Sequence, residues 1–252
     1  MALRYLTRSF ANLGQTQICN MATKLSAIRA KYNDSHNVFL ESDIAVKDPY
    51  AIFKQWMDMA IEHPNIKEPN AAALATVDKQ GCPSNRFVLL KDYSTNGFTF
   101  FTNYESRKAK DIENNPNVAM TVYWQPLHRS VRIEGKAEKV PKEESIKYFH
   151  ERPRDSQISA KASPQSQRIP DRATLKNWEA EVKAQLKDGE EVPTPNWGGY
   201  LIRPHAIEFW QGQSNRLHDR IRFICGEDAE KEVDGVLVHK GENGWVFERL
   251  AP

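Results

Sequence analysis

Several features that mark common protein classes are absent from this 252-residue chain. The three cysteines, Cys19, Cys82 and Cys225, lie far apart and form no C-x-x-C pair. They therefore indicate neither a disulfide framework nor a zinc site, and we expect no bound metal and a reducing compartment. No apolar run reaches the roughly 18 residues that a membrane helix needs. The net charge of +2 is too small to indicate nucleic acid or an anionic membrane as a partner.

The usual nucleotide and hydrolase motifs are missing as well. The sequence contains no G-x-G-x-x-G and no G-x-x-x-x-G-K-[ST], which argues against the common dinucleotide and P-loop sites. It contains no H-E-x-x-H and no G-x-S-x-G, which argues against metalloproteases and α/β-hydrolases. What remains is a set of cations in unusual local settings.

Acidic residues are absent from the first 33 positions, since Asp34 is the first one. The same segment carries Arg4, Arg8, Lys24, Arg29 and Lys31. Such a start is typical of a mitochondrial transit peptide, but it also suits a flexible tail on a cytoplasmic protein, which we favour. We therefore expect a tail over residues 1–44 and a single domain over residues 45–252.

Beyond the tail, strand patterns recur at short intervals. The segment "NAAALATVDKQGCPSNRFVLLKDYSTNGFTFFTN" is broken by the turn signals "KQG" and "TNG". Further strands are expected within residues 118–140, 200–209, 216–223 and 235–250. The pattern predicts a mainly β fold with surrounding helices (α+β), built as a barrel or a sandwich.

Helix signals occur at four places between and before these strands, including one at Ser106. Asp48 suits an N-cap before Pro49, and the helix that follows would place Ile52, Trp56, Met59 and Ala60 on one face. Pro141 opens a second helix. A third helix runs from Asp171 until Gly189 ends it.

The segment "NYESRKAKDIENNP" sets two cations at a helix start. Ser106 is a good N-cap, and the helix would run to about Asn114. Arg107 and Lys108 then fall in the first turn, where the helix macrodipole disfavours positive charge. A bound phosphate would make both cations favourable, because helix N-termini and basic side chains bind anions. The alternative is that both side chains point into water.

Two further settings carry less information. In a strand, Arg86, Val88 and Leu90 share one face while Phe87, Leu89 and Lys91 share the other. The two terminal cations either emerge into solvent or flank a ligand. Tyr148 and Arg152 lie four residues apart, with Ser156 just beyond, so the three could converge on one oxyanion or form an ordinary helix end.

The stretch "EFWQGQSNRLHDRIRF" combines positive charge with apolar and aromatic residues. If it is a strand, Arg216, His218 and Arg220 lie on one face. A row of cations on one strand face is costly without counter-charge. A bound anion or electron-rich ring would supply that charge, and so would acidic residues from neighbouring strands.

Taken together, these segments resemble the pyridoxine (pyridoxamine) 5′-phosphate oxidase family. The resemblance rests on "RFVLLK", "FFTNYESRKAK", "YFHERPRDSQI", "QS" at Gln165–Ser166, "EFWQGQSNRLHDRI" and the closing "ERLAP". It runs from about Arg29 to the C-terminus, and "FWQG-x-x-NRLHDR" is its most specific part.

The resemblance implies a set of site residues at the matching positions. The flavin (FMN) contacts would be Arg86, Phe87, Val88, Leu89, Leu90, Lys91, Phe101, Thr102, Arg107, Lys108, Gln165, Ser166, Trp210 and Arg220. The substrate contacts would be Lys91, Tyr148, Arg152, Ser156, Arg216 and His218, with Arg216 and His218 acting in catalysis. Arg29 and Tyr32 of "RAKY" would cover the bound substrate.

The resemblance also implies a fold and a reaction. The fold would be an FMN-binding split β-barrel that works as a homodimer, with the flavin at the subunit interface. The reaction would oxidise pyridoxine 5′-phosphate and pyridoxamine 5′-phosphate to pyridoxal 5′-phosphate. A hydride would pass from the substrate C4′ to flavin N5, and O2 would then reoxidise the flavin and give hydrogen peroxide.

One position departs from the family pattern. Where the family usually has "RQV", with the glutamine on the flavin, this chain has Ser130, a shorter side chain without an amide. An alternative function is therefore a split-barrel carrier or sensor that binds FMN or pyridoxal phosphate without efficient turnover. A nucleic-acid binder is a more distant alternative, because the cations match defined anion sites.

Overall fold

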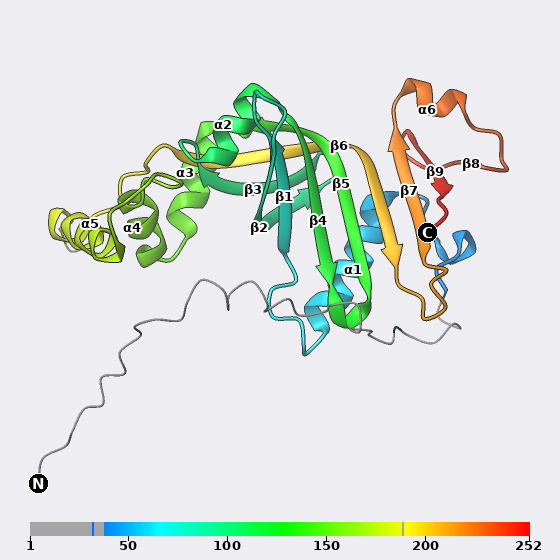
Figure 1. Ribbon diagram of the computed structural model, residues 1–252, viewed down its shortest axis with the longest axis horizontal. Helices are drawn as coiled ribbons and strands as arrows, with labels where there is room; N and C mark the ends of the chain where they lie inside the picture. The colour runs from blue at the N-terminus through cyan, green and yellow to red at the C-terminus, as the bar shows by residue number, and fades with distance from the viewer. Residues whose placement is uncertain (1–31, 33–37, 188) are drawn as a thin grey trace, which may run out of the picture. The chain divides into compact units, whose positions relative to one another are not determined.

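The computed structural model describes Tyr32, residues 38–187 and residues 189–252 (Figure 1). Its internal contacts divide the chain into two units, Met1–Tyr32 and Asn33–Pro252. Arg29 and most of the predicted tail lie outside the described residues, and Tyr32 belongs to the first unit. The fold described below is that of the second unit.

Six antiparallel strands of the second unit close into a barrel (Figure 1). They are β1 (Ala71–Val77), β2 (Pro83–Ser94), β3 (Gly97–Asn103), β4 (Asn117–Trp124), β5 (Arg129–Lys139) and β6 (Trp197–Gln211). Their order is β3-β2-β1-β4-β5-β6, and a β3–β6 pairing closes the ring. The predicted fold class, a split β-barrel with surrounding helices, is confirmed.

Strand β6 is long enough to take part in both the barrel and the sheet beyond it. One edge pairs with β5, while the other pairs first with β3 and then, from Ala206 on, with β7 (Asp219–Cys225). β7 continues the sheet to β9 (Trp245–Arg249) and β8 (Val238–Lys240). The change of partner falls at Pro204, which has no N–H to give to a ladder.

The β5–β6 register shifts beside this proline, and a glycine makes the shift possible. A Cβ on Gly135 would lie 2.2 Å from the Arg203 carbonyl oxygen, far inside van der Waals contact. We expect Gly135→Ala to lower the free energy of unfolding by about 2–3 kcal/mol, because two backbones must move apart. Urea unfolding tests this against Lys136→Ala, which changes the neighbouring exposed residue. Equal unfolding midpoints for the two variants would contradict the prediction.

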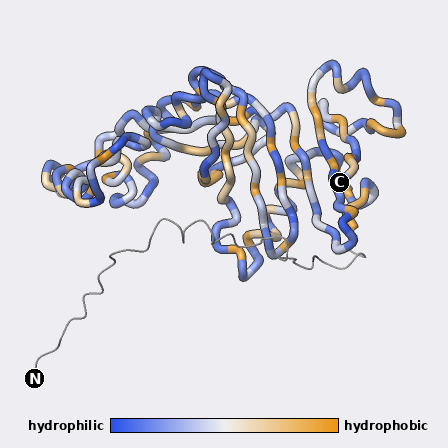
Figure 2. Tube along the Cα trace, viewed as in Figure 1, coloured by the Kyte–Doolittle hydropathy of each residue, from blue (hydrophilic) through white to orange (hydrophobic). Residues whose placement is uncertain are grey.

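The barrel interior is the core, and helix α1 (Pro49–Glu62) packs into it. Strand residues alternate between buried and more exposed positions, as in β1. Figure 2 shows hydrophobic residues along the barrel strands. Phe53 and Trp56 of α1 meet Phe98 and Phe209 at ring-centroid distances of 4.9 and 5.3 Å. Asp48 caps the helix as predicted, by accepting the Tyr50 N–H. Of the four residues predicted to share one face, Ile52, Trp56 and Ala60 are buried, while Met59 is 41% exposed.

The remaining helices lie mainly at one end of the barrel. They are α2 (Arg107–Asn114), α3 (Lys142–Glu151), α4 (Arg154–Ala162), α5 (Arg172–Gln185) and the short α6 (Glu227–Lys231). Figure 1 shows α3, α4 and α5 together beside the start of β6. Helix α5 ends at Gln185, before the predicted stop at Gly189. Helices α4 and α6 were not predicted, and Ser156, expected in a loop, lies in α4. Among residues 38–187 and 189–252, no helix is both long and apolar enough to cross a membrane.

Candidate active site

A pocket of about 700 Å³ opens where α3 and α4 meet the strands β2, β3 and β6. We call it the α3–α4 pocket. Of the predicted site residues, Leu89, Lys91, Phe101, Thr102, Tyr148, Arg152, Ser156 and Gln165 line it. The sequence did not indicate the other lining residues, which are Asn103, Pro153, Asp155, Ser159, Ala160, Ser163 and Trp197. The structure thus gathers flavin and substrate candidates from distant parts of the chain.

Three aromatic rings form one wall of this pocket. Phe101 lies 4.1 Å from Tyr148 and 5.2 Å from Trp197, between ring centroids, and the Phe101 and Trp197 planes differ by only 16°. The first ring comes from β3, the second from α3 and the third from the first residue of β6. A stack of this kind gives a rigid, apolar surface against which a flat ligand can pack.

Arg152 brings an unbalanced positive charge to the same wall. Its guanidinium lies 4.8 Å from the Trp197 ring, and burial lowers its pKa while Tyr148 acts in the opposite direction. One guanidinium nitrogen, Nη1, is buried and has no acceptor among the residues that the structure describes. A buried unpaired donor is costly, and an anion in the pocket would satisfy it.

Lys108 forms a second cationic position at the edge of the pocket. Its side chain is 9% exposed, and Nζ donates to Thr102 Oγ1 at 3.0 Å and to Gln165 Oε1 at 2.8 Å. Burial, together with the nearby Arg86, lowers the pKa of Lys108 to about 8. Ser106 caps α2 as predicted, with its hydroxyl accepting the Ala109 N–H. The alternative that both cations of this helix start point into water is wrong for Lys108.

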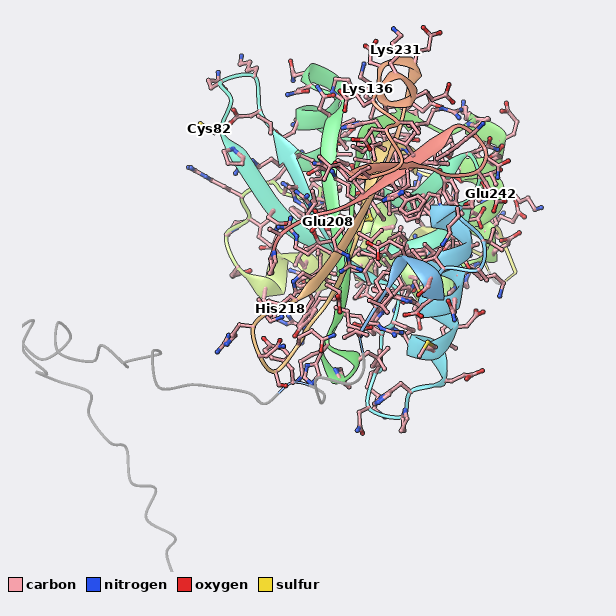
Figure 3. The ribbon with its side chains drawn as sticks, turned by 90° about the vertical axis from the view of Figure 1, so that its right-hand side faces the viewer. Cys82, Lys136, Glu208, His218, Lys231 and Glu242 are labelled. Atoms are coloured by element: carbon pink, nitrogen blue, oxygen red, sulfur yellow. The ribbon has the colours of Figure 1, made fainter. Side chains whose placement is uncertain are left out.

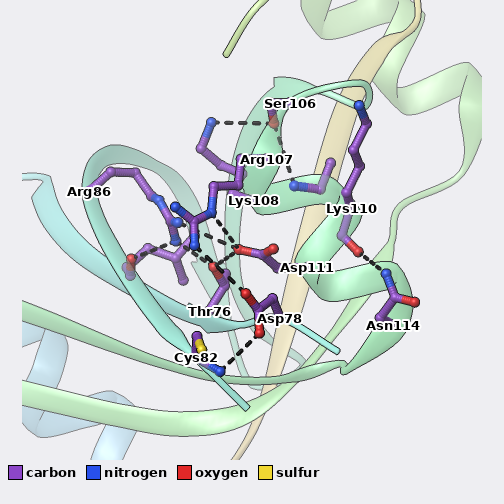
Figure 4. A network of polar contacts seen from close by, with 12 residues as sticks. Thr76, Asp78, Cys82, Arg86, Ser106, Arg107, Lys108, Lys110, Asp111 and Asn114 are labelled. Carbon is purple, nitrogen blue, oxygen red and sulfur yellow. Dashed lines mark hydrogen bonds and ion pairs between the residues drawn. The ribbon is translucent and has the colours of Figure 1, made fainter. Parts of the chain in front are cut away.

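Arg86 and Arg107 flank this helix start, as Figure 4 shows. Arg86 donates to Thr76 Oγ1 at 2.7 Å and lies 3.7 Å from a carboxylate oxygen of Asp111. Burial lowers the pKa of Arg86, and Asp111 opposes that shift. Arg107 is about half exposed and lies 3.9 Å from both Asp111 and Asp78, too far for hydrogen bonds. Three cations therefore surround the α2 N-terminus. Arg86 and Arg107 share Asp111 at ion-pair distance, while the side chains that accept from Lys108 are neutral.

The predicted row of cations on one strand face is wrong. β7 begins at Asp219, and Arg216 and His218 lie in the preceding loop, where Arg216 has a left-handed φ of 69°. We call residues 212–218 the β6–β7 loop. The His218 ring packs on Trp210, with centroids 4.9 Å apart. Figure 3 shows His218 at the loop end of the strand pair that carries Glu208.

Arg220 is on β7, and an acid from the neighbouring strand balances its charge. It donates to Glu208 at 2.8 Å, and Arg132 contacts the other Glu208 oxygen. Burial alone would raise the pKa of the Glu208 carboxyl, but the hydrogen bonds from Arg220 and Arg132 hold it below its ordinary value. A shallow cavity of about 350 Å³ lies over this group and is lined by Thr121, Tyr123, Ser130, Arg132, Glu208 and Trp210. Ser130, the position that departs from the family pattern, thus lies beside Trp210.

The predicted site residues fall into two groups that β6 separates. Trp197 begins the strand and lines the α3–α4 pocket, whereas Trp210 lies near its other end beside the β6–β7 loop. Thirteen residues of extended chain span roughly 40 Å along the strand. The first group includes Lys91, Arg152 and Lys108, while the second includes Trp210, Arg216, His218 and Arg220. Ser166, with φ 72°, is exposed and follows Gln165.

The closed barrel, its extension through β7 and the cation-lined pocket define the split-barrel class. Residues 62–184 match the family model described as "Pyridoxamine 5′-phosphate oxidase". Residues 197–252 match the one described as "Pyridoxine 5′-phosphate oxidase C-terminal dimerisation region".

Curated relatives extend this match to nearly the whole chain. A pyridoxine/pyridoxamine 5′-phosphate oxidase of Bombyx mori is 52% identical over 237 residues, which cover 93% of this chain and 92% of that protein. A pyridoxine-5′-phosphate oxidase of Bos taurus is 47% identical over 232 residues, 92% of this chain and 88% of that protein. The chain belongs to the pyridoxine/pyridoxamine 5′-phosphate oxidase family and is an oxidoreductase.

Solved structures agree on the fold. PhzG from Burkholderia lata, determined with tetrahydrophenazine-1-carboxylic acid, superposes with a TM-score of 0.72 at 27% identity. It covers 85% of this chain and 98% of its own. A pyridoxamine 5′-phosphate oxidase-related, FMN-binding protein from Nostoc punctiforme has a TM-score of 0.60 at 16% identity, covering 81% of this chain and 98% of its own. At that identity the second likeness supports the fold alone.

Proposed function

We propose that this protein is an FMN-dependent oxidase that converts pyridoxine 5′-phosphate and pyridoxamine 5′-phosphate into pyridoxal 5′-phosphate. The observation that carries the proposal is Arg152, whose buried, unpaired Nη1 lies in the wall of an aromatic-lined pocket. A flat ring that bears a phosphate fits that combination. Family membership and relatives named for these two substrates support the choice.

The reaction balances with O2 as the oxidant. Pyridoxine phosphate loses two electrons and two protons at its C4′ carbinol, and O2 takes them up as hydrogen peroxide. Pyridoxamine phosphate passes through an imine, which water hydrolyses to the aldehyde and ammonia. Bound FMN supplies the hydride acceptor and the route of the electrons to O2.

The residues around Lys108 suit the phosphate of FMN. Lys108 is buried with only neutral partners, Thr102 and Gln165, and Arg86 and Arg107 lie near the same helix start. This donor set presents several charge-assisted hydrogen bonds to an anion at a helix N-terminus. Leu89 of β2 lines the α3–α4 pocket, and Phe87 shares its strand face. Val88 and Leu90 face the opposite way and would contact FMN only through their backbone.

Substrate binding would use the α3–α4 pocket and the β6–β7 loop together. Arg152, Lys91, Ser156 and Tyr148 would hold the substrate phosphate, because all four line one pocket. Arg216 and His218 would orient the pyridine ring and stabilise charge that develops during transfer. Arg29 and Tyr32 would cover the bound substrate.

A homodimer with FMN at its interface would unite the two groups of site residues. In one chain they lie at opposite ends of β6, so a second copy is the simplest way to bring them together. The outer sheet face supports this arrangement. Phe87 is 78% exposed there, and the register sets it beside Ala73, which in turn pairs with Thr121. An apolar face of small residues flanked by an exposed aromatic ring is suited to packing against another copy.

Peroxide release tests the proposed function. The purified protein should be yellow and should release one peroxide for each pyridoxal phosphate formed when either substrate is added in air. A yellow protein that binds the substrates but releases no peroxide would overturn the oxidase proposal and indicate a carrier.

The lowered pKa of Lys108 makes FMN binding depend on pH. Bound phosphate favours the charged amine and raises its pKa, so above about pH 8 binding must take up a proton. We expect the affinity for FMN to be level below about pH 7.5 and to fall up to tenfold per pH unit above pH 8. Fluorescence titration of the apoprotein measures it.

Two lysine variants test whether Lys108 causes the decline of FMN affinity above pH 8. Lys108→Met should bind FMN more weakly and lose the decline above pH 8. Lys110→Met changes an exposed lysine on the same helix and should keep the wild-type profile. A wild-type affinity that stays level up to pH 9.5 would contradict the role given to Lys108.

A further inference from the structure

The β6–β7 loop, residues 212–218, contains one residue in an unfavourable backbone conformation. Arg216 adopts a left-handed φ of 69°, which is unfavourable for a residue with a Cβ. The Arg216 N–H donates to the Gln213 carbonyl at 3.2 Å, and the Gly212 N–H donates to the His128 carbonyl at 2.8 Å. An unfavourable backbone conformation persists only where the surroundings fix it, so the loop needs an anchor.

That anchor is a buried pair, Gln213 and Asp219. Their exposed fractions are 2% and 7%, and Gln213 Nε2 donates to Asp219 Oδ2 at 2.7 Å. Asp219 also accepts the Phe39 N–H at 3.0 Å and Arg249 Nη1 at 2.8 Å. Arg249 in turn pairs with Glu41. The segment before α1, the last strand and the loop therefore meet on one carboxylate.

The same anchor reaches the ring of His218. The Gln213 backbone N–H donates to His218 Nδ1 at 2.9 Å. A nitrogen that accepts a hydrogen bond carries no proton, so the single ring proton of neutral His218 is on Nε2. Trp210 packs against the ring and limits its rotation. The loop thus selects a tautomer as well as a position.

The charges around His218 favour the neutral ring. Burial lowers its pKa from the ordinary value, Arg216 lowers it further, and Asp219 acts in the opposite direction. Asp219 is itself balanced by Arg249 from β9, with Glu41 beyond. Protonation at Nδ1 would in addition break the hydrogen bond from Gln213. His218 is therefore neutral at pH 7, and it becomes charged only when the pH falls below its lowered pKa.

We infer that Gln213 and Asp219 are positioning residues that hold His218 as the neutral Nε2–H tautomer, so that His218 donates a hydrogen bond to the substrate. This inference rests on the proposed function, because it takes His218 as a residue that touches the substrate. A donor at Nε2 suits an oxygen substituent of the pyridine ring, because that oxygen can accept the hydrogen bond and so fix the ring's orientation. In this tautomer Nε2 cannot remove a proton from the substrate, so His218 is not the general base.

Histidine side-chain NMR of the 15N-labelled holoenzyme reads the tautomer without any turnover. His218→Gln identifies the resonances by their loss. We expect His218 to show a protonated Nε2 and an unprotonated Nδ1 at pH 7 and to titrate below the ordinary histidine range. A protonated Nδ1, or a ring that interconverts freely between tautomers, would overturn the inference even if the Gln213 variant does not fold.

Two matched variants test the anchor itself. Gln213→Met removes the amide that binds Asp219, whereas Gln211→Met removes an equally buried amide that accepts from Arg129. In Gln213→Met, His218 should populate both tautomers and its pKa should rise. The acid limb of the pH profile of kcat should move to higher pH by the same amount, and kcat should fall about tenfold. Gln211→Met should leave the tautomer and the pH profile unchanged.

The outcomes separate this inference from the proposed function. An unchanged tautomer in folded Gln213→Met would overturn the positioning role. A protein that shows the expected tautomer but oxidises neither substrate would retain the anchor and overturn the proposed function instead.

Discussion

Arg216→Ala is expected to lower kcat/KM for pyridoxine 5′-phosphate by about a hundredfold to a thousandfold. Arg216 lies in the β6–β7 loop beside His218, where its guanidinium would face the pyridine ring and the charge that develops on it. Removal of one fixed donor that acts on developing charge costs this much in other enzymes. Steady-state kinetics with peroxide detection measures the change.

The structure supplies a control for this variant on the same loop. Leu217 is 68% exposed, so Leu217→Ala removes an adjacent side chain that the loop does not bury. A φ of 69° is unfavourable for alanine as it is for arginine, because both carry a Cβ. Arg216→Ala therefore leaves the backbone strain nearly unchanged. If Arg216→Ala kept the kcat/KM of the wild-type enzyme, the role of Arg216 would be wrong.

Arg152→Met is expected to raise KM for both phosphorylated substrates by on the order of a hundredfold. Methionine can keep the packing against Trp197 and Phe149, but it removes Nη1, the buried hydrogen-bond donor that has no acceptor in the substrate-free protein. The same change should leave the thermal midpoint of the substrate-free enzyme unchanged or higher, because the free protein no longer buries an unpaired cation. Loss of substrate affinity together with retained stability distinguishes a binding residue from a structural one.

Arg154→Met is the matched control. Arg154 is exposed two residues away, donates to the Glu190 carbonyl and does not line the α3–α4 pocket. Its KM should match that of the wild-type enzyme. A wild-type KM for Arg152→Met, or a thermal midpoint several degrees below wild type, would show that Arg152 serves the fold and not the substrate phosphate.

Helix starts were the most predictable features of the fold. Asp48 and Ser106 cap α1 and α2 as expected, because an N-cap interaction depends on residues only two or three positions away. The strands of the barrel were predictable for a similar reason, since alternation and turn residues act locally. The pairing of β6 with three different strands had no local signal and depends on the closure of the barrel.

The start of β7 shows where period-2 reasoning fails. A repeating pattern assumes that the chain is extended, and Arg216 at a φ of 69° reverses it just before the strand begins. The cations were therefore identified, while their geometry was not. Only Arg220 lies on the strand, and there an acid from β6 pairs with it, which was the ordinary alternative.

The site itself was predictable in its residues but not in its connections. Lys108 was indicated by an unfavourable helix position, yet its contact with Gln165 joins residues 57 positions apart. Trp197 and Gln213 carried no signal at all, because an aromatic ring after a loop and a buried amide are common in any sequence. Their roles emerge only when the strands bring distant segments together.

Anaerobic reduction of the bound flavin tests the central claim most directly. The purified holoenzyme is mixed with pyridoxine 5′-phosphate or pyridoxamine 5′-phosphate without O2, and the visible flavin band is followed. The account predicts that each substrate bleaches the band with formation of one pyridoxal 5′-phosphate per flavin, and that O2 restores the colour with release of peroxide. A band that stays unchanged with both substrates while they bind would contradict the account.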